Sequence, residues 1–215
     1  MKPRLMLVTP HFAPERGGVP RLLSTIVGAS DGVAEWRVFT TAEAAAGNPE
    51  GLDVGDGALV DRALAVTRAR STSGLVAAAL QTRGWLRPDS DDRVVCGHPY
   101  YTPVAVAIGE LLRIPVVGLA YGRELVPTRA THHVALSAMR ACRTIVTISE
   151  RSAREVAARG VSIDRVSIVH PVLPPVWSVQ TPQPRRALEP LRLVMVARMA
   201  EGYKNFELAI RVAGL

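Results

Sequence analysis

The sequence predicts an α/β protein: a Rossmann-like parallel sheet with helices on both faces, followed by the start of a truncated second Rossmann-like domain. Short apolar segments alternate with amphipathic segments of about ten residues, which is the pattern of βαβ units. Several apolar segments are unbroken, which is typical of strands buried on both faces. The alternation stops at a proline-rich stretch and starts again near Leu191, which indicates the second domain.

The first half of the chain is predicted to supply three strands and two helices. In order, these elements are the strand Leu5–Val8, a glycine-containing loop at 14–19, a helix carrying Leu22, Leu23, Ile26 and Val27, strands at 36–41 and 59–66, and a helix at 73–83. The three- and four-residue spacing of the apolar side chains in the first helix gives it one buried face.

The second half is predicted to continue the same sheet. In order, the elements are a strand at 93–97, a helix at 103–113, a strand at 114–119, a helix at 132–142, a strand at 144–148, a helix ending at Arg159 and a strand at 166–169. Ser149 is suited to cap the last of these helices and Gly160 to end it.

Six prolines then fall between Pro171 and Pro190 without any periodicity, which predicts an interdomain linker at 171–190 after a first domain of residues 1–170. Beyond the linker, residues 191–196 are expected to form a strand and 205–212 a helix. One strand and one helix are the beginning of a domain, so residues 191–215 are predicted to be an incomplete second domain.

Composition limits the classes of function. The chain has 215 residues, a hydrophobic fraction of 48% and a formal net charge of +7. Its arginines are scattered rather than clustered, and aromatic residues make up only 5%, so base-stacking surfaces are scarce and no nucleic-acid partner is expected. No apolar run reaches the ~18–20 residues of a membrane-spanning helix. We expect a cytoplasmic protein, with peripheral contact at the inner membrane face left open.

Cofactor and metal sites are not expected. The glycines after the first strand do not form the Gly-x-Gly-x-x-Gly pattern of dinucleotide binding. The pair His132-His133 has no further ligands at the spacing of a metal site. Cys96 and Cys142 lie in or beside apolar strand segments and are interpreted as reduced core residues.

Two places suit phosphate binding. Gly17-Gly18 stands at the entry to the first helix, where backbone amides and the helix N-terminus favour an anion, although the pair could also simply turn the chain. Arg198 leaves the end of the strand at 191–196, and Lys204 follows at a helix start. Two cations at that edge suit a diphosphate, although solvated surface charges are the alternative.

These segments, with two others, resemble glycosyltransferase family 4. In chain order they are Thr9-Pro10-x-Phe12-x-Pro14-x-x-Gly17-Gly18-Val19-x-Arg21, Val146–Glu150 with Arg154, Ile168–Val172, and Val196-Ala197-Arg198-x5-Lys204-Asn205. They are similar to the family's opening loop, its Val-Ser-Glu segment, its Ile-Pro-Asn-Gly-Val segment and its Gly-Arg…Lys-Gly donor-phosphate motif.

The resemblance implies a GT-B architecture, in which two Rossmann-like domains face each other across the active site. The N-terminal domain would bind a carbohydrate or lipid-linked acceptor, and the C-terminal domain most of the nucleotide sugar. Gly17 and Gly18 would contact the donor diphosphate, and Arg198 and Lys204 would neutralise it as the glycosidic bond breaks, so that no metal is required.

The sequence departs from the family at the acceptor cleft. Where the family often has His-Gly, this chain has Tyr121-Gly122, so Tyr121, Arg123 and Glu124 are predicted to line the cleft with a different side chain near the reacting sugar. His98 follows the strand at 93–97 and is predicted to lie at the same cleft, a structural role being the alternative. The family's Glu-x7-Glu region would lie beyond Leu215, so this chain alone is not expected to catalyse transfer.

The sequence therefore predicts the acceptor-side portion of a retaining, nucleotide-sugar-dependent glycosyltransferase, with retention implied by the resemblance alone. Two alternatives remain. One is a non-catalytic, truncated or split Rossmann-type binding module. The other is a sugar-nucleotide epimerase of GT-B architecture, which the Thr-Pro…Gly-Gly-Val loop disfavours.

Overall fold

The computed structural model describes residues 1–13, 15, 17–30, 32–41, 65–170 and 210–211. The chain divides into two units, Met1–Pro174 and Pro175–Leu215. Of the second unit only Ile210 and Arg211 are described, and both are helical and exposed. The predicted linker, the predicted strand at 191–196 and the candidate phosphate ligands Arg198 and Lys204 lie outside the described residues.

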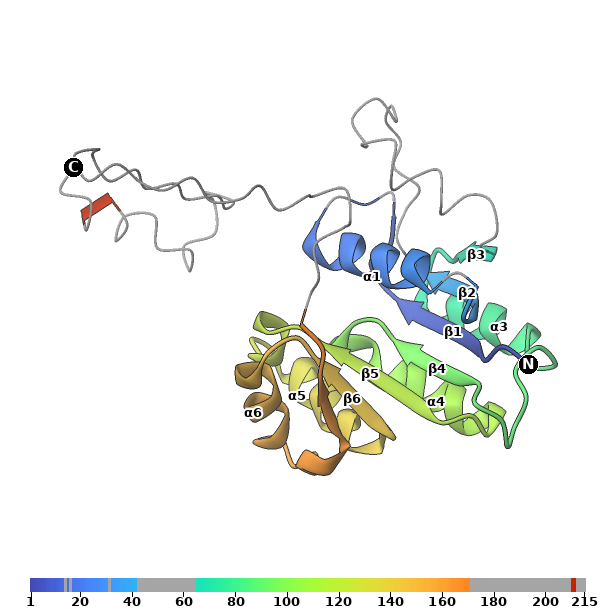
Figure 1. Ribbon diagram of the computed structural model, residues 1–215. Helices are drawn as coiled ribbons and strands as arrows, with labels where there is room; N and C mark the ends of the chain where they lie inside the picture. Colours follow the sequence, from blue (N-terminus) through green and yellow to red (C-terminus); the bar gives the residue numbers. More distant parts are fainter. Residues whose placement is uncertain (14, 16, 31, 42–64, 171–209, 212–215) are drawn as a thin grey trace, which may run out of the picture. The chain divides into compact units, whose positions relative to one another are not determined.

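The first unit is built on one parallel sheet of seven described strands in the order β3-β2-β1-β4-β5-β6-β7 (Figure 1). The strands are β1 (Arg4–Thr9), β2 (Glu35–Thr40), β3 (Ala65–Arg68), β4 (Arg93–Cys96), β5 (Val116–Ala120), β6 (Thr144–Thr147) and β7 (Val166–Ile168). Strands on one side of β1 follow it directly in the chain, whereas those on its other side begin with β4. The predicted Rossmann-like parallel sheet is confirmed.

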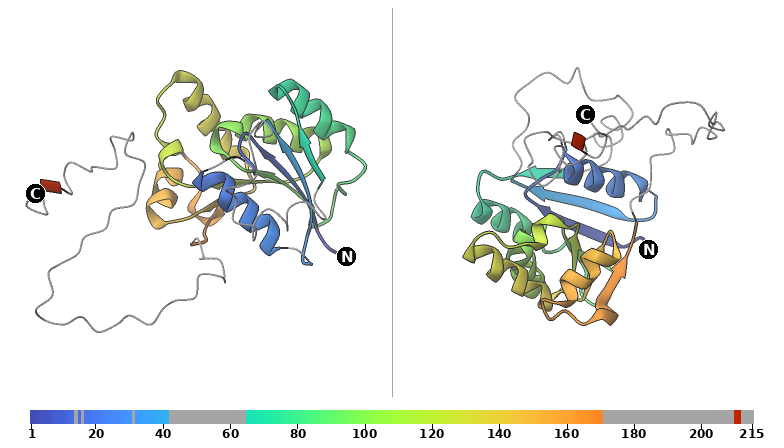
Figure 2. Two further views of the ribbon diagram at one scale, coloured as in Figure 1. Left: turned by 90° about the horizontal axis from the view of Figure 1, so that it is seen from above. Right: turned by 90° about the vertical axis from the view of Figure 1, so that its left-hand side faces the viewer.

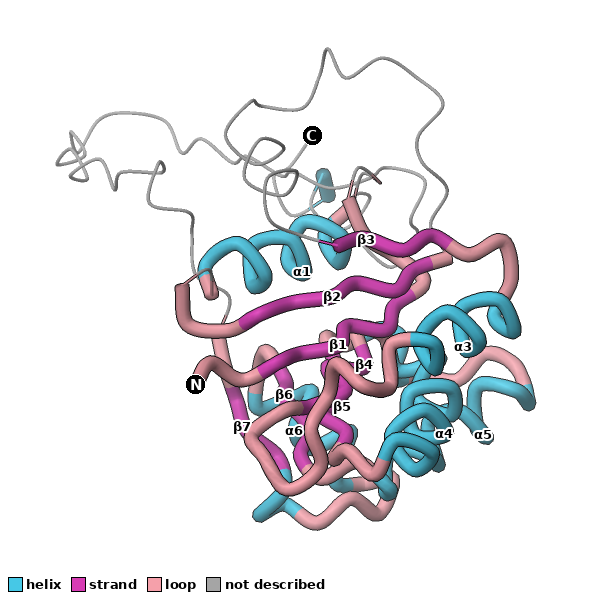
Figure 3. The backbone as a smooth tube through the Cα atoms, turned by 90° about the vertical axis from the view of Figure 1, so that its right-hand side faces the viewer, coloured by secondary structure: helices cyan, strands magenta, loops and turns pink. Residues whose placement is uncertain are grey.

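Helices cover both faces of this sheet (Figures 2 and 3). The described α-helices are α1 (Gly18–Ala29), α3 (Thr72–Gln81), α4 (Thr102–Leu112), α5 (Ala130–Ser137) and α6 (Glu150–Ala157). Leu23 and Val27 of α1 form one apolar cluster with the sheet, and the larger cluster on the opposite face includes residues of α3, α4, α5 and α6. None of the helices in the described ranges is long and apolar enough to cross a bilayer.

Burial on both faces of the sheet explains why the sequences of the central strands are continuously apolar. In β1, Met6 and Val8 belong to the larger cluster and Leu7 to the smaller one, and all three are at most 1% exposed. Successive side chains of a strand point to opposite faces, so a strand covered on both faces needs an apolar residue at every position. Both cysteines are free and buried, as expected of core residues.

The helix predicted at 132–142 differs from the observed one. The α-helix runs from Ala130 to Ser137, and a 3-10 helix over Ala138–Ala141 replaces its last turn. The tighter turn buries Met139 and is followed at Cys142 by the extended backbone that leads into β6. Such tightening is common where a helix ends. Ser149 caps α6 as predicted, and Gly160, at a positive φ of 82°, follows its end.

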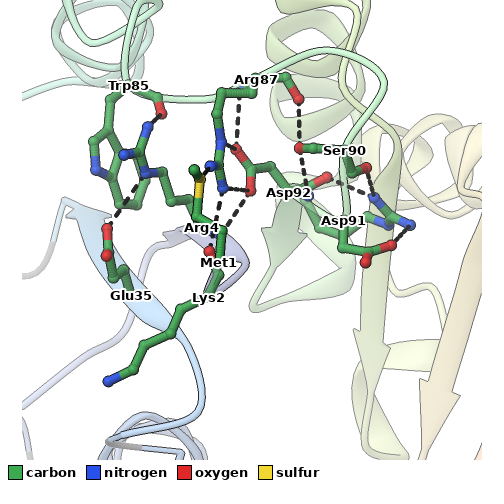
Figure 4. A network of polar contacts seen from close by, with 10 residues as sticks. Met1, Lys2, Arg4, Glu35, Trp85, Arg87, Ser90, Asp91 and Asp92 are labelled. Atoms are coloured by element: carbon green, nitrogen blue, oxygen red, sulfur yellow. Dashed lines mark hydrogen bonds and ion pairs between the residues drawn. The ribbon is translucent and has the colours of Figure 1, made fainter.

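A charged network ties the amino ends of β1 and β4 together (Figure 4). The Asp92 carboxylate is fully buried and accepts hydrogen bonds from the Arg4 amide at 2.8 Å, the Arg87 amide at 2.8 Å and two nitrogens of the Arg87 guanidinium at 3.1 and 2.9 Å. The Arg4 side chain in turn donates to the Trp85 carbonyl at 2.7 Å. The amino ends of these two central strands are therefore held by charge-assisted hydrogen bonds as well as by apolar packing.

These bonds keep Asp92 ionised. Burial by itself raises the pKa of this carboxyl group, but the hydrogen bonds from Arg87 and from the Arg4 and Arg87 amides outweigh burial and hold the pKa well below its usual range. A carboxyl group with a depressed pKa in the folded state stabilises the fold above its unfolded pKa of about 4. That contribution is lost as the pH falls below this value.

We predict that Asp92→Asn lowers the free energy of unfolding by roughly 1.5–3 kcal/mol, because the amide nitrogen cannot accept from Arg87 and the guanidinium loses its charged partner. Urea unfolding at pH 7 measures this loss, and the difference from the wild type should shrink between pH 4 and pH 2. The matched control is Asp91→Asn. The Asp91 side chain is 94% exposed, and its ion pair with Arg93 is long at 3.8 Å. Equal stabilities of the two variants would contradict the role given to Asp92.

Candidate functional site

The carboxyl ends of β1 and β4 form the point at which the order of the sheet reverses. The two strands are hydrogen-bonded neighbours, and the helices that follow them, α1 and α4, pack on opposite faces. In open parallel sheets, the crevice at such a point is where ligands bind. The residues that leave these two strand ends are therefore the first candidates for a site.

Gly97 lets the end of β4 come close to β1. A Cβ atom at this position would lie 2.8 Å from the Thr9 Cβ and 3.0 Å from a Leu7 methyl group, which is closer than side chains pack. The Gly97 amide donates to the Val8 carbonyl at 2.8 Å, so the pairing continues one residue beyond the strand. His98 is consequently held beside the loop that follows β1.

Four rings lie in a row near the carboxyl ends of β1 and β4. We call them the ring row: His11, His98, Tyr100 and His132. The centroids of His11 and His98 are 5.5 Å apart in an edge-on arrangement, and those of His98 and Tyr100 are 5.1 Å apart. Tyr100 and His132 are stacked at 3.8 Å with 15° between their planes. The β1–α1 loop, the β4–α4 connection and α5 thus bring three imidazoles together.

Each imidazole of the ring row uses its Nδ1 atom in a local hydrogen bond. His11 Nδ1 lies 2.9 and 3.0 Å from the two carboxylate oxygens of Glu15. The Tyr100 amide donates to His98 Nδ1 at 3.2 Å, and the Thr128 amide donates to His132 Nδ1 at 3.3 Å. The rings are therefore oriented by the protein itself.

His98 is kept neutral. Burial lowers the pKa of His98 to about 4, with smaller contributions in the same direction from His11 and His132. At pH 7 its imidazole is uncharged and offers one N–H donor, which suits hydrogen bonding to a neutral group better than ion pairing.

Tyr121 and Glu124 organise the loop after β5. The Tyr121 hydroxyl donates to the Gly97 carbonyl at 2.9 Å, and burial raises the pKa of this phenol, so it stays protonated. The Glu124 carboxylate accepts hydrogen bonds from the Tyr121 amide and, at 2.8 Å, from the Gly122 amide. Gly122 has a φ of 157° and a ψ of −86°, a conformation that disfavours any side chain. This loop thus supports Gly97 and His98 from the β5 side.

Gly17 and Gly18 stand at the start of α1, on the same loop as His11. Among the described residues, no side chain caps the helix, and a Cβ atom on Gly18 would meet nothing within 4 Å. Neither the backbone nor the packing of the described residues therefore requires glycine at position 18. An open, uncapped helix N-terminus leaves backbone amides accessible to an anion.

The predicted site residues fall into different groups. His98, Tyr121 and Glu124 are brought together around Gly97, and Gly17 and Gly18 lie at the same edge of the sheet. Arg123 lies in a short 3-10 helix over Arg123–Leu125 and is exposed. The described residues hold no group of three or more His, Cys, Asp or Glu side chains able to bind a metal ion. The roles assigned to these residues stay predictions.

Sequence analysis did not assign His11 and Glu15 to the site, and it did not place His132 against Tyr100. The available signal was the position of His11 directly after the first strand, with Glu15 four residues later. Residues from three separate segments meet only once the sheet is formed, so spacing along the chain could not reveal the ring row.

Comparison with known proteins shows a likeness in structure only. No family model and no curated protein matches the sequence. The structure of HepE from Anabaena in complex with UDP-glucose is similar with a TM-score of 0.57 at 16% identity, over 78% of this chain and 43% of that one. The lipopolysaccharide outer core galactosyltransferase WaaB is similar with a TM-score of 0.52 at 16% identity, over 86% of this chain and 50% of that one.

The UDP-N-acetylglucosamine 2-epimerase of Rickettsia bellii is also similar, with a TM-score of 0.52 at 13% identity, over 78% of this chain and 44% of that one. These likenesses show the fold, a Rossmann-like domain of the GT-B type. The chain spans half or less of the length of each of the three structures.

We predict that Tyr121→Phe lowers the free energy of unfolding by about 1 kcal/mol, because the Gly97 carbonyl loses its hydrogen-bond donor. The matched control is Tyr100→Phe, since the Tyr100 hydroxyl has no hydrogen bond to any described residue. Urea denaturation compares the two. A Tyr121→Phe variant as stable as Tyr100→Phe would show that the hydroxyl does not support the strand end.

Proposed function

We propose that this chain is the acceptor-side portion of a nucleotide-sugar-dependent glycosyltransferase. The observation that carries the proposal is the pairing of two features at the carboxyl ends of the strands of a GT-B-type sheet: a helix N-terminus at Gly17-Gly18 that no described side chain caps, and a row of hydrogen-bonding rings that includes the neutral His98. The first suits a diphosphate and the second a sugar hydroxyl. The loop after β1 contributes to both.

The donor is proposed to be a nucleoside diphosphate sugar. Gly17 and Gly18 would approach its phosphates through their amides, and Arg198 and Lys204 would neutralise the charge that develops on the leaving diphosphate. With two cations in that role, the proposal requires no metal ion. Transfer with retention of configuration is proposed on the family resemblance, and the stereochemistry of a product formed when both domains are present would test it.

The acceptor is proposed to be a carbohydrate or a lipid-linked sugar bound beside His98, with Tyr121, Arg123 and Glu124 at the edge of that site. Peripheral contact with a membrane fits a lipid-linked acceptor and is part of this proposal. An epimerase would need no acceptor site, so the ring row favours transfer over epimerisation. We expect no turnover by these 215 residues, because most donor contacts are proposed to lie in the second domain.

Donor binding is tested by ³¹P NMR of UDP-glucose, GDP-glucose and ADP-glucose, which detects weak contact with the diphosphate. We expect the chain to broaden the diphosphate signals of at least one of them, and addition of EDTA to leave that broadening unchanged. Absence of broadening for all three would contradict the proposed function.

Lys204→Ala should weaken this binding by about 10-fold or more, since a charge-assisted contact to phosphate contributes roughly 1.5–3 kcal/mol. Lys2→Ala is the matched control, because Lys2 is the only other lysine and is exposed beside the amino end of β1. Equal binding by the two variants would count against Lys204 as a phosphate ligand.

Gly18→Ala separates binding from folding. The new methyl group meets no described atom, and alanine favours helix, so stability should not fall. The methyl group would nevertheless stand over the amides that a phosphate approaches, and we expect binding to weaken by about 3- to 10-fold. Gly28→Ala is the control, since Gly28 lies at the other end of α1 and has equally open surroundings. If both variants bind equally well, the glycine loop does not contact the donor.

A further inference from the structure

The hydrogen bonds around His11 and His98 fix opposite tautomers. An ionised carboxylate can only accept, so the contact of Glu15 with His11 Nδ1 requires the proton on Nδ1. A neutral His11 then has a lone pair on Nε2. A backbone amide can only donate, so the Tyr100 amide requires the lone pair of His98 on Nδ1. A neutral His98 therefore has its proton on Nε2.

Neither Nε2 atom is completely buried. Within the part of the chain that the structure describes, neither has a hydrogen-bond partner, and no buried side-chain nitrogen or oxygen lacks one. An Nε2 atom without a partner must therefore reach the surface. The acceptor and the donor thus belong to two neighbouring rings, whose centroids are 5.5 Å apart.

We propose that His11 and His98 together bind one hydroxyl group of a neutral, polyhydroxylated acceptor, with the hydroxyl proton donated to His11 Nε2 and the hydroxyl oxygen accepting from His98 Nε2. Glu15 is a positioning residue that sets the tautomer of His11. The identification of the ligand as an acceptor substrate rests on the proposed function.

A hydroxyl group matches this pair because it donates and accepts through one atom. Each of its two hydrogen bonds would have the usual heavy-atom length of about 2.7–3.0 Å. A carboxylate or phosphate would face the lone pair of His11, and an ammonium group would face the N–H of His98, so both are disfavoured. The lowered pKa of His98 keeps this selectivity at neutral pH, since its imidazole stays uncharged.

The tautomers can be measured directly by ¹⁵N NMR of the histidine side chains at pH 7.5. We expect His11 to be protonated at Nδ1 and His98 at Nε2, whereas the exposed His133 should populate both forms. In Glu15→Ala, His11 should lose its fixed tautomer while His98 keeps its own. Glu150→Ala is the control, since Glu150 is 79% exposed and pairs only loosely with Arg154 at 3.7 Å. The same tautomer on both rings, or no response to Glu15→Ala, would overturn the proposal.

Binding is tested with the methyl glycosides of glucose, galactose and mannose as neutral probes, glucuronate as the anion and glucosamine as the cation. We expect at least one neutral probe to shift both His11 and His98 side-chain signals, and to bind at least 5-fold more weakly to Glu15→Ala than to the wild type or Glu150→Ala. Shifts caused only by a charged probe, or by none of the probes, would overturn the hydroxyl site. Neutral binding without any contact with a nucleotide sugar would leave this site standing and contradict the proposed transferase.

Discussion

The pairing of β1 with β4 is the contact on which the rest of the structure depends. It joins two parts of the chain whose paired residues are 88 positions apart, and it places the reversal of strand order in the middle of the sheet. Gly97 permits the close approach at the carboxyl end, and Asp92 fastens the amino end through Arg4 and Arg87. Every residue of the candidate site on these two strands inherits its position from this pairing.

The amino and carboxyl ends of the strands have different roles because their polar side chains differ in how many of their atoms are hydrogen-bonded. At the amino edge, the Asp92 carboxylate is buried and its oxygens receive four hydrogen bonds, so the network stabilises the fold and leaves nothing for a ligand. At the carboxyl ends of the strands, the histidines of the ring row hold their Nδ1 atoms in local bonds, and the Nε2 atoms of His11 and His98 have no hydrogen-bond partner among the described residues. Rigid support with exposed, oriented groups is the arrangement that binding requires.

The β1–α1 loop connects the two proposed subsites. It contains His11, whose ring lies edge-on to that of His98, and ends at Gly17, where no described side chain caps α1. A movement of this loop would change acceptor and donor contacts together. The same loop contains Glu15, so the orientation of His11 is set by a residue that lies between the subsites. This coupling fits a transferase, in which acceptor hydroxyl and donor diphosphate must be held at the same time.

The sequence by itself determined the alternation of strands and helices and the parallel sheet, and it placed the ends of most elements to within about two residues, because strand burial and helix amphipathicity produce local periodicity. It also pointed to Gly17-Gly18, which stands at the start of the first helix, and to His98, which follows a strand. Only the tertiary structure decided that Tyr121 and Glu124 bond to neighbouring backbone and that His11, Glu15, Tyr100 and His132 meet. These contacts depend on strand order and on side-chain direction between segments far apart in the chain, which local periodicity does not contain.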